Sequence, residues 1–585
     1  MAYQLSPGVR WSEIDLTTII PSVSSTVGAF VGDFEWGPIN EVVSVGNEIE
    51  LVRYFHKPTQ NTFTSFFTAA NYLGYAEAML VVRAANTLSA LNATSGNTGL
   101  LIRNQDSYLN SYLDLSADNK YGMFAARCAG SLGNSLKVSL YAGSSNTTAY
   151  NAWEYYQQFP GVPGTSAWAN TRGGSNDEMH IIVLDYGGLI TGTPNTVLEK
   201  FSYASKASDA KNDSGGSNYY VNIINENSQY IYIINPAQSG NGGTGTDTFT
   251  WGNVSNNTAF TQGNTAYTAI LANGSIGSTL ASNSDITLAY DLFKDPEQWD
   301  VSLIMTGGHS QTVGQYVLEN VVGGTSSNPD TGRRDAVVFL SPQRSDVLGV
   351  SNTFTSYITT QVVNRRNSFN SSSYAVIDCN WKLQFDKYNN VYRWVPLNGD
   401  IAGLCPRTDF ERDPWFSPAG FNRGHIKNVT RLAWNPGKDD RDTLYSAGIN
   451  PVVQFKGEGV VLYGDKTMLA KPSAFDRINV RRLFIVLEKA ISKAAKYSLF
   501  EFNDEFTRAQ FVALVEPYLR DVKGRRGIFD FRVVCDETNN TPEVIDRNEF
   551  VGDIYIKPAR SINFIQLNFV AVRTGVAFSE VIGKF

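Results

Sequence analysis

One segment of the sequence carries almost the full spacing of a phosphate-binding loop. Gly459 and Gly464 enclose four residues, and Asp465 and Lys466 follow the second glycine. In a GxxxxGKS/T loop the lysine follows that glycine directly, and a helix begins there so that backbone amides converge on phosphate. Here Asp465 adds negative charge where phosphate would lie, the enclosed residues VVLY are bulky and strand-forming, and Pro472 follows soon after. The pattern therefore argues against nucleotide binding.

The other candidate motifs for catalysis are weaker. TGGHSQTVG, which contains His309, lacks the GxGxxG spacing and the acidic partner of a dinucleotide turn. HExxH and GxSxG are absent, and Asp439 and Asp440 belong to the run KDDRD, which is typical of a solvated loop. The four cysteines form no CxxC pair, and four histidines add no metal-ligand cluster. We therefore expect no enzyme activity and no nucleotide, metal or covalent cofactor.

Length and composition indicate a folded protein of several domains. A chain of 585 residues exceeds what one hydrophobic core supports. The net charge of −7 gives no support for nucleic-acid binding, and the aromatic content of 12% leans toward an assembly component. The opening MAYQLSPGVRWSEID has no signal-peptide pattern, and no apolar run reaches the roughly 18–20 residues of a membrane span. We expect no membrane partner and no direct contact with nucleic acid.

Three composition regimes follow one another along the chain. Residues 21–88 are rich in apolar residues and contain the strand-like GAFVGDF, the helix-like TSFFTAANYLGYAEAM and the strand-like LVVRA. Residues 89–285 are rich in Gly, Ser, Asn and Thr, which is typical of an inserted, surface-exposed module. Its expected strands are SLKVSLYA, HIIVLDY, YYVNIIN and YIYIIN.

The part after residue 285 has an α/β pattern. WDVSLIMTGG and DAVVFLSP are strand-like and flank QTVGQYVLENVV, which has helical spacing, so we predict a βαβ unit. SAFDRINVRRLFIVLEKAISKAAKYSLF is the strongest helix signal in the chain. Ser473 or Asp476 could cap the start of this helix. The positive charges of Lys493 and Lys496 are favourable in its last turns. The fold class expected is multidomain α/β and α+β.

The long helix also carries a row of positive charge, here called the basic stripe: Arg482, Lys489, Lys493 and Lys496. Their spacings of 7, 4 and 3 place them on one narrow face, while the apolar residues lie mainly on other faces. The stripe is either a contact surface for an acidic partner or an ordinary solvated lysine face. The pattern alone favours neither interpretation.

Several segments in order resemble one known family. LSPGVRWSEID, GAFVGDFEWGPINEVVSV and LVVRA are followed by RRDAVVFLSP, WFSPAGFNRG, YSAGINPVVQFKGEGVVLYGDKT, INVRRLFIVLEKAI and SLFEFNDEFTR. This series resembles contractile bacteriophage tail sheath proteins of the large-phage type, over residues 1–88 and 286–585. The resemblance is weaker in the middle, where the short interval from Asn86 to Met123 implies that the outermost domain of large members is reduced or missing.

The resemblance implies a domain layout. It places an N-terminal arm at 1–20, a middle α/β domain at 21–88 and 286–450, and a mainly β outer insertion at 89–285. An inner α/β domain with a C-terminal arm follows at 451–585, and neighbours' terminal arms complete its mixed sheet. The near phosphate-binding loop is then a strand and a turn.

The resemblance also implies a mechanical function. Sheath subunits polymerise as six-fold rings around an inner tail tube and contract to drive the tube through the host envelope for genome ejection. The implied partners are further copies of this chain, the tail tube protein, the baseplate and the tail terminator. The implied location is the virion tail, after assembly in the host cytoplasm. On this interpretation the basic stripe faces the tube.

Two terminal segments are candidates for linking subunits. At the N-terminus a Pro-Gly turn precedes apolar residues at alternate positions, and near the C-terminus apolar residues alternate within VAFSEVIGKF. An extended segment of this kind either adds a strand to a neighbour's sheet or forms an edge strand of its own subunit. The residues concerned are Pro7, Gly8, Val9, Trp11, Val576 and Phe578.

Three alternative functions are considered for this chain. The first is the sheath of a phage-derived contractile injection system, which is usually shorter than this chain or split in two. The second is an extracellular adhesin, suggested by the Gly/Ser/Asn-rich middle but lacking a secretion signal. The third is a nucleotide-driven motor, which rests only on the imperfect loop at Gly459.

Overall fold

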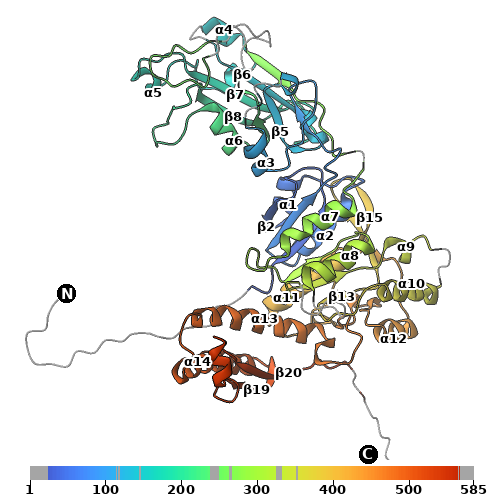
Figure 1. The fold of residues 1–585 in the computed structure, drawn as a ribbon. Coiled ribbons are helices and arrows are strands. Elements are labelled where there is room, and N and C mark those ends of the chain that lie inside the picture. The colour runs from blue at the N-terminus through green and yellow to red at the C-terminus, as the bar shows by residue number, and fades with distance from the viewer. Residues whose placement is uncertain are drawn as a thin grey trace, which may run out of the picture. The chain divides into compact units, whose positions relative to one another are not determined.

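The computed structural model describes residues 24–563 and 566, apart from 114, 116–118, 144–146, 237–249, 263–265, 278, 324–331 and 351–353. The described chain forms two compact units (Figure 1). The main unit contains the residues up to Pro414 and Pro418–Tyr497, and the C-terminal unit contains Trp415–Ser417 and the residues from Ser498 onward. The inner-domain boundary expected at residue 451 does not coincide with this division, because Val452, Leu462 and Ile478 lie in the core of the main unit.

A six-stranded sheet forms the centre of the main unit. Its order is β13-β12-β11-β1-β3-β2, and every pair is parallel except β2 with β3. The parallel strands are apolar on both faces, as strands covered by helices on both sides must be. The strands are β1 (Gly28–Asp33), β2 (Val42–Val45), β3 (Met79–Ala84), β11 (Leu303–Met305), β12 (Val337–Leu340) and β13 (Ala375–Ile377).

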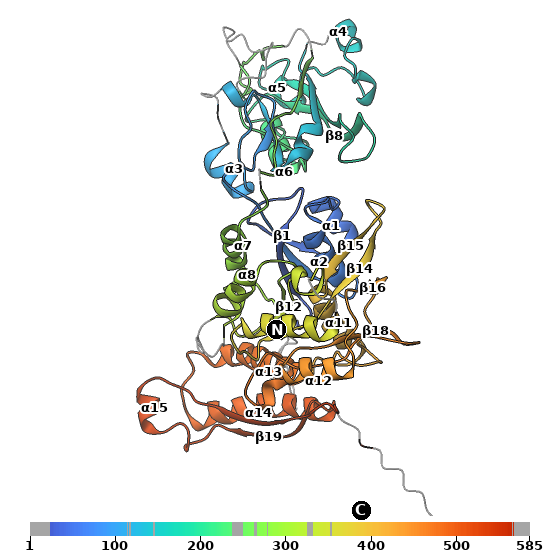
Figure 2. The same ribbon diagram turned by 90° about the vertical axis from the view of Figure 1, so that its right-hand side faces the viewer.

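Helices cover both faces of this sheet. In Figure 2, β1 and β12 lie between α7 and α8 on one side and α2 and α11 on the other. The predicted βαβ unit is confirmed, since β11 and β12 are parallel and α8 lies between them in the chain. The helices are α1 (Glu48–Phe55), α2 (Phe63–Leu73), α7 (Asn283–Tyr290), α8 (Gln311–Tyr316, continued by the π-helical turn Val317–Val322), α9 (Arg344–Val347), α10 (Thr355–Asn367), α11 (Asn398–Glu411) and α12 (Lys438–Ser446).

Two small antiparallel sheets and short 3-10 turns complete this part. The near phosphate-binding loop lies in the second sheet, where β17 and β18 form a hairpin. The strands are β14 (Trp381–Asp386), β15 (Val391–Pro396), β16 (Arg431–Leu432), β17 (Val452–Phe455) and β18 (Gly459–Leu462). The 3-10 turns within the described residues are Asn119–Tyr121, Ser131–Ser135, Tyr156–Gln158, Asp291–Phe293, Ala474–Asp476 and Lys496–Ser498.

The segment between β3 and α7 has hydrophobic cores of its own. Its sheets have the orders β4-β5-β9 and β10-β6-β7-β8. The strands are β4 (Asn92–Thr94), β5 (Phe124–Ala129), β6 (Leu136–Tyr141), β7 (Glu178–Asp185), β8 (Thr196–Ser205), β9 (Ile231–Ile233) and β10 (Tyr267–Ile270). The helices are α3 (Gln105–Ser111), α4 (Thr147–Asn151), α5 (Ala167–Asn170) and α6 (Tyr220–Asn227).

One strand prediction in this segment is wrong. YYVNIIN was expected to be a strand, but it forms most of helix α6. Tyr220, Val221 and Ile224 are buried on one helical face, and Asn225 is buried beside them. The Asn225 amide donates to the Tyr108 hydroxyl and accepts from the Ile233 backbone N–H at 2.9 Å. The buried residues therefore follow the spacing of a helix. In a run of apolar residues this short, the sequence does not distinguish a helix from a strand.

The long helix predicted near residue 480 is α13 (Ile478–Ala495), and it belongs to the main unit. Its N-cap is Arg477. Ser473 instead accepts from the Phe475 N–H and caps the preceding 3-10 turn. The C-terminal unit follows with α14 (Glu505–Gly524), α15 (Pro542–Asp546), β19 (Ile528–Val534) and β20 (Asp553–Pro558).

The C-terminal unit has a small core of its own. Helix α14 buries Phe511, Val515 and Leu519 at four-residue spacing, which is one face of an α-helix. Strands β19 and β20 pair antiparallel and, among the described residues, pair with no third strand. A two-stranded sheet is only marginally stable alone, so the packing of α14 contributes much of the stability of this unit.

Leu519→Ala should therefore destabilise the C-terminal unit. Leu519 is fully buried, so the substitution leaves a cavity and should lower the free energy of unfolding by about 2–5 kcal/mol. Urea unfolding combined with hydrogen exchange would measure the change and place it in α14. The neighbouring Arg520→Ala is the control, because the Arg520 side chain is 72% exposed and should have little effect. Equal destabilisation by both variants would contradict this account.

Candidate functional site

The carboxyl ends of the parallel strands are where α/β proteins usually bind ligands. Here a buried polar network occupies that edge. The Asn398 amide donates to Gly307 O at 2.8 Å and to Ser341 Oγ at 3.1 Å, and it accepts from the Gly307 N–H. Ser341 Oγ in turn donates to the Asp378 carboxylate at 2.5 Å. Burial raises the pKa of Asp378 to about 7. The protein's own side chains thus satisfy these polar groups.

A buried ion pair lies in the same region. Lys382 Nζ donates to Asp400 Oδ1 at 2.8 Å, and both side chains are almost fully buried. Burial lowers the pKa of Lys382 and raises that of Asp400, although each partner opposes the shift of the other. Lys382 also donates to Lys427 O, and the Tyr75 hydroxyl donates to Asp400. These contacts hold β14 to α11 and form a structural pair.

The near phosphate-binding loop serves the fold. Gly459 begins β18, which pairs with β17, so the strand and turn implied by the resemblance are confirmed. Lys466 Nζ donates to Tyr445 O at 2.8 Å and lies over the Tyr445 ring. Asp465 is buried and accepts from the Tyr445 hydroxyl at 3.2 Å. The lysine therefore has partners within the chain. The N-terminus of α13 lies beside this segment, but the N–H of Ile478, the first residue of that helix, donates to Asp465 O at 2.8 Å.

The other residues that were candidates for catalysis or metal binding also lie in structural surroundings. His309 Nε2 lies 2.7 Å from Val31 O, its ring stacks on Phe30, and burial lowers its pKa. All four cysteines are free and buried. Among the described residues, no three His, Cys, Asp or Glu side chains are grouped to hold a metal ion. In that part of the chain no helix is both long and apolar enough to span a membrane.

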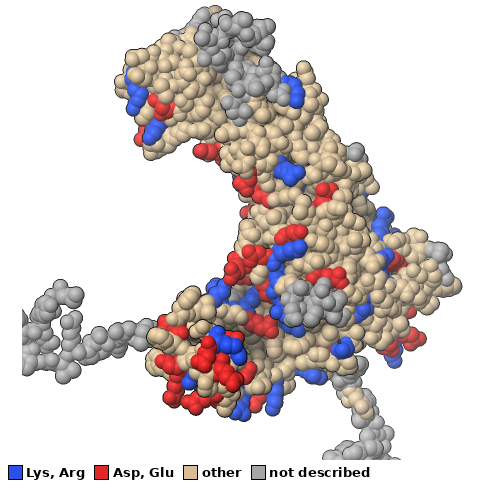
Figure 3. Space-filling view, viewed as in Figure 1, with Lys and Arg blue, Asp and Glu red and all other residues tan. Residues whose placement is uncertain are grey.

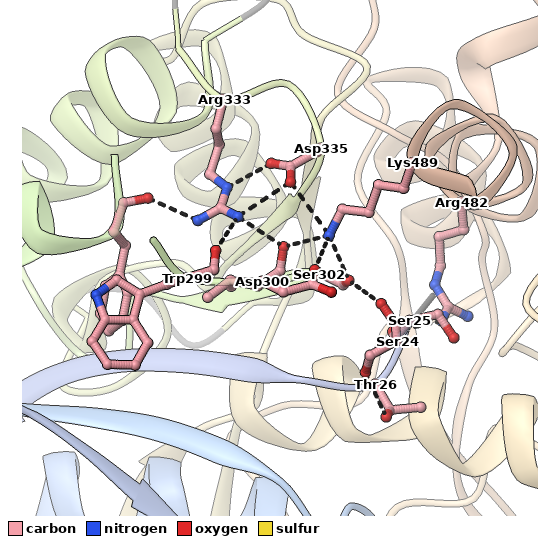
Figure 4. Close-up of polar contacts among 12 residues, drawn as sticks. Ser24, Ser25, Thr26, Trp299, Asp300, Ser302, Arg333, Asp335, Arg482 and Lys489 are labelled. Carbon is pink, nitrogen blue, oxygen red and sulfur yellow. Dashed lines mark hydrogen bonds and ion pairs between the residues drawn. The ribbon is translucent and has the colours of Figure 1, made fainter. Parts of the chain in front are cut away.

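The basic stripe is not one exposed face, which corrects the interpretation of Arg482 and Lys489. The Arg482 side chain is only 3% exposed and makes two hydrogen bonds to Asp409, at 2.8 Å and 2.5 Å. Lys489 is 10% exposed and its Nζ lies 2.8 Å from Asp300 Oδ1 and 3.3 Å from Asp335 Oδ2 (Figure 4). Both cations are directed into the main unit rather than outward.

The C-terminal part of the stripe is different. Lys493 is exposed, and Lys496 is 63% exposed and paired with Glu297 at 2.7 Å. Figure 3 shows acidic and basic side chains interspersed on the face in view. Helical spacing identified one face of α13 correctly, but it carried no information about the distant carboxylates opposite that face.

Burial and ion pairing compete at Arg482. Burial disfavours the charged guanidinium, but the Asp409 carboxylate more than offsets this, so the pKa of Arg482 lies above its ordinary value. Arg333 makes a similar anchor nearby, with bonds to Asp335 and to the carbonyls of Phe293, Trp299 and Val301 (Figure 4). These buried charges fix α13 and the segment before β11 within the main unit.

The subunit-linking residues predicted from the sequence are not part of the described structure. The residues concerned are Pro7, Gly8, Val9, Trp11, Val576 and Phe578, and all lie outside the described residues. The surface on which such segments could lie is described. In the C-terminal unit Phe529 on β19 is 69% exposed and Tyr555 on β20 is 61% exposed. Leu499, Phe500, Phe502 and Phe506 in and before α14 are also exposed.

Exposed apolar side chains on a small open sheet are characteristic of assembly subunits. Together with the polar clusters closed by the chain itself, they are features expected of a structural component. Comparison with known proteins gives the family.

The chain belongs to the phage tail sheath proteins. Residues 281–468 match the phage tail sheath protein central domain, and residues 470–571 match the phage tail sheath C-terminal domain. The tail sheath protein of Vibrio phage KVP40 is 36% identical over 99% of this chain and 100% of its own length. That of Enterobacteria phage T4 is 34% identical over 99% of both chains.

The solved structures agree in fold. The crystal structure of a sheath tail protein from Listeria innocua has a TM-score of 0.51 and 10% identity, covering 92% of this chain and 96% of its own. The alignment with the Vibrio phage protein extends over 693 positions, more than the 585 residues of this chain. That relative therefore contains segments that this chain lacks.

Breaking the buried pair on α13 should cost much more than breaking an exposed one. Arg482→Ala leaves Asp409 buried without its cation and should lower the free energy of unfolding by about 3–5 kcal/mol. Lys496→Ala, at an exposed position just after the same helix, should change it by less than about 1 kcal/mol. Chemical denaturation would compare the two variants. Similar small effects would mean that Asp409 is solvated in solution.

The pH dependence of the free energy of unfolding should reflect the ionisation of Asp378. Its pKa is raised in the folded protein, so between pH 4 and 7 the folded state binds a proton that the unfolded state has lost. Its stabilising contribution is complete at acid pH and falls as the pH rises toward about 7. Asp378→Asn cannot ionise, so denaturation at several pH values should show a flatter profile for the variant over this interval. Parallel profiles would exclude this carboxyl as the cause.

Proposed function

We propose that this chain is the structural subunit of a contractile phage tail sheath. The subunits polymerise as six-fold rings stacked around the inner tail tube, and they contract together to drive the tube through the host envelope for genome ejection. The observation that carries the proposal is similarity to phage tail sheath proteins over the full length of the chain. The baseplate and tail terminator are the partners at the two ends of the sheath.

The linkage between subunits is proposed to be strand addition in the C-terminal unit. Strands β19 and β20 leave backbone groups free for further pairing, since within the described residues they form a two-stranded sheet. An added strand supplies a ladder of main-chain hydrogen bonds and covers exposed apolar side chains such as Phe529 and Tyr555. The N-terminal and C-terminal arms of neighbours are the proposed strands. Such links persist while the domains they join rotate.

Contraction needs no nucleotide in this proposal. The energy is stored when subunits assemble into an extended lattice held behind a kinetic barrier, and it is released as the lattice rearranges. The structural roles of Lys466 and Asp465 support this view, because the imperfect loop is used to hold the fold. Head-to-tail contacts between identical subunits propagate naturally into a helical sheath.

The proposed tube-facing surface is the exposed end of α13. Lys493 is exposed there, and Lys496 is exposed although it pairs with Glu297, whereas Arg482 and Lys489 are buried against carboxylates of the same subunit. Exposed charges contribute attraction that is screened by salt and adjusts easily when the lattice moves. This limits the proposed contact to part of the basic stripe.

Charge reversal tests that contact. Lys493→Glu/Lys496→Glu should reduce the fraction of sheaths that enclose a tube, while the monomer stays folded because both side chains are exposed. Co-assembly with tube protein at low and high salt, followed by electron microscopy, would measure the fraction filled. Lys438→Glu/Lys456→Glu is the control for two reversed charges, since both lysines are exposed in the main unit and lie outside α13 and the β19–β20 sheet. An unchanged filled fraction would leave these lysines as solvent-exposed residues only.

Removing either arm tests the linkage. Deletion of residues 1–16, or of residues 576–585, should give a folded monomer that forms no sheath, because the whole hydrogen-bond ladder is lost. Trp11→Ala should weaken assembly only in part, since the backbone contacts remain. Circular dichroism and thermal melting would check the fold, and negative-stain microscopy would check the polymers. Normal sheaths from a truncated chain would show that its arm is no linker, and unfolding would place that arm in its own subunit's core.

A further inference from the structure

The chain that leads into β1 is held in an unusual way. Residues 24–27, here called the arm root, connect the N-terminal arm to the central sheet. The Val27 carbonyl accepts from the backbone N–H groups of Ser302 and Leu303, as expected beside β11. The three carbonyls before it accept instead from side chains. These bonds hold the backbone of the arm root through its carbonyl groups.

The three side-chain donors come from three different elements. Ser302 Oγ, just before β11, donates to Ser24 O at 3.0 Å. The Arg482 guanidinium on α13 donates to Ser25 O at 3.4 Å. The Tyr72 hydroxyl on α2 donates to Thr26 O at 2.6 Å. Successive peptide groups are therefore tied to the central sheet, to the long helix and to a covering helix.

Further bonds tie these donors together. Ser25 Oγ donates to Asp409 Oδ2 at 2.6 Å, and Asp409 is the carboxylate that holds Arg482. Lys489 Nζ donates to Ser302 Oγ at 3.1 Å (Figure 4). The two stripe residues directed away from the surface therefore both act at the arm root. Stability alone does not require this, because Ser24 is exposed and water could satisfy its carbonyl.

We propose that Ser302, Arg482 and Tyr72 form a clamp that sets the direction in which the N-terminal arm leaves the subunit. They are positioning residues for assembly, and the inference rests on the proposed strand-adding function of the arm. An arm of about 20 residues spans at most roughly 70 Å when extended. A fixed exit direction concentrates its end near one neighbour's sheet edge, whereas a loose root spreads it over many directions.

The test uses the double variant Ser25→Ala/Ser302→Ala. It removes the Ser25–Asp409 bond and the Ser302–Ser24 bond, but the Arg482–Asp409 pair stays intact. Lys489 also keeps Asp300 and Asp335. The fold is therefore expected to survive, and thermal melting would verify it. Ser44→Ala is the control, since Ser44 is exposed on β2, at the sheet edge farthest from β13.

Spin labels at Ser22→Cys and Ser492→Cys would report the exit direction in the monomer, before any assembly. The four native cysteines are buried, so the labels should react selectively. The distance distribution between the labels should be narrow in the parent protein and about twofold wider in the double variant. The yield of sheath polymers should fall by about tenfold because the effective concentration of the arm falls. Arg482→Lys, which loses the forked geometry, should widen the distribution as well.

The outcomes separate the two proposals. An unchanged distance distribution would overturn the clamp, whatever happens to assembly. A wider distribution with a normal yield of polymers would also overturn it, because the exit direction would then be irrelevant to linkage. A parent protein that forms no sheath while the monomer distances respond as expected would contradict the proposed function and leave the clamp as a structural device.

Discussion

Burying a guanidinium costs free energy unless its charge is paired, and one such pair organises the centre of the protein. Arg482 and Asp409 meet between α13 and α11, and the same pair reaches the chain that leads into β1. Lys489 makes a second junction with Asp300 and Asp335 beside β11. Since separating such buried charges is costly, α13 behaves as part of the main unit although it lies late in the sequence. The β-sheet, the covering helices and the arm root are therefore held together as one body.

The C-terminal unit is built on the opposite principle. Its core is small, its sheet has two strands, and several aromatic side chains remain exposed. A structure of this kind gains much when further strands are added, and it can give up one neighbour for another at modest cost. In the proposed mechanism, a sheath subunit needs both properties: a body that moves without deforming, and a surface that stays linked while bodies move. The distribution of buried charge and exposed apolar area between the units corresponds to that need.

The sequence correctly predicted the strands that have apolar surroundings on both faces. GAFVGDF, LVVRA and DAVVFLSP are strands because both faces of a parallel sheet are apolar, and a run of apolar residues is then sufficient evidence. YYVNIIN failed because its contacts, including Asn225 with Tyr108, depend on a partner more than a hundred residues away. The basic stripe failed for the same reason. Helical periodicity gave the face of Arg482 and Lys489 but could not reveal Asp409, Asp300 or Asp335 opposite them. No sequence motif predicts the contacts of the arm root, because their acceptors are backbone carbonyls, which every residue has.

The segment between β3 and α7 leaves and rejoins the main sheet at one place. Asn86 donates to Thr279 across the two ends at 2.9 Å, and Leu91 pairs with Ser275 through two backbone hydrogen bonds. The Ala281 N–H is tied back to Asp33 at the end of β1. A module closed at its base in this way can be lengthened, shortened or exchanged by recombination without altering the register of the sheet beneath it. Changes in the length of this segment should therefore leave the strand pairing of the main sheet in place.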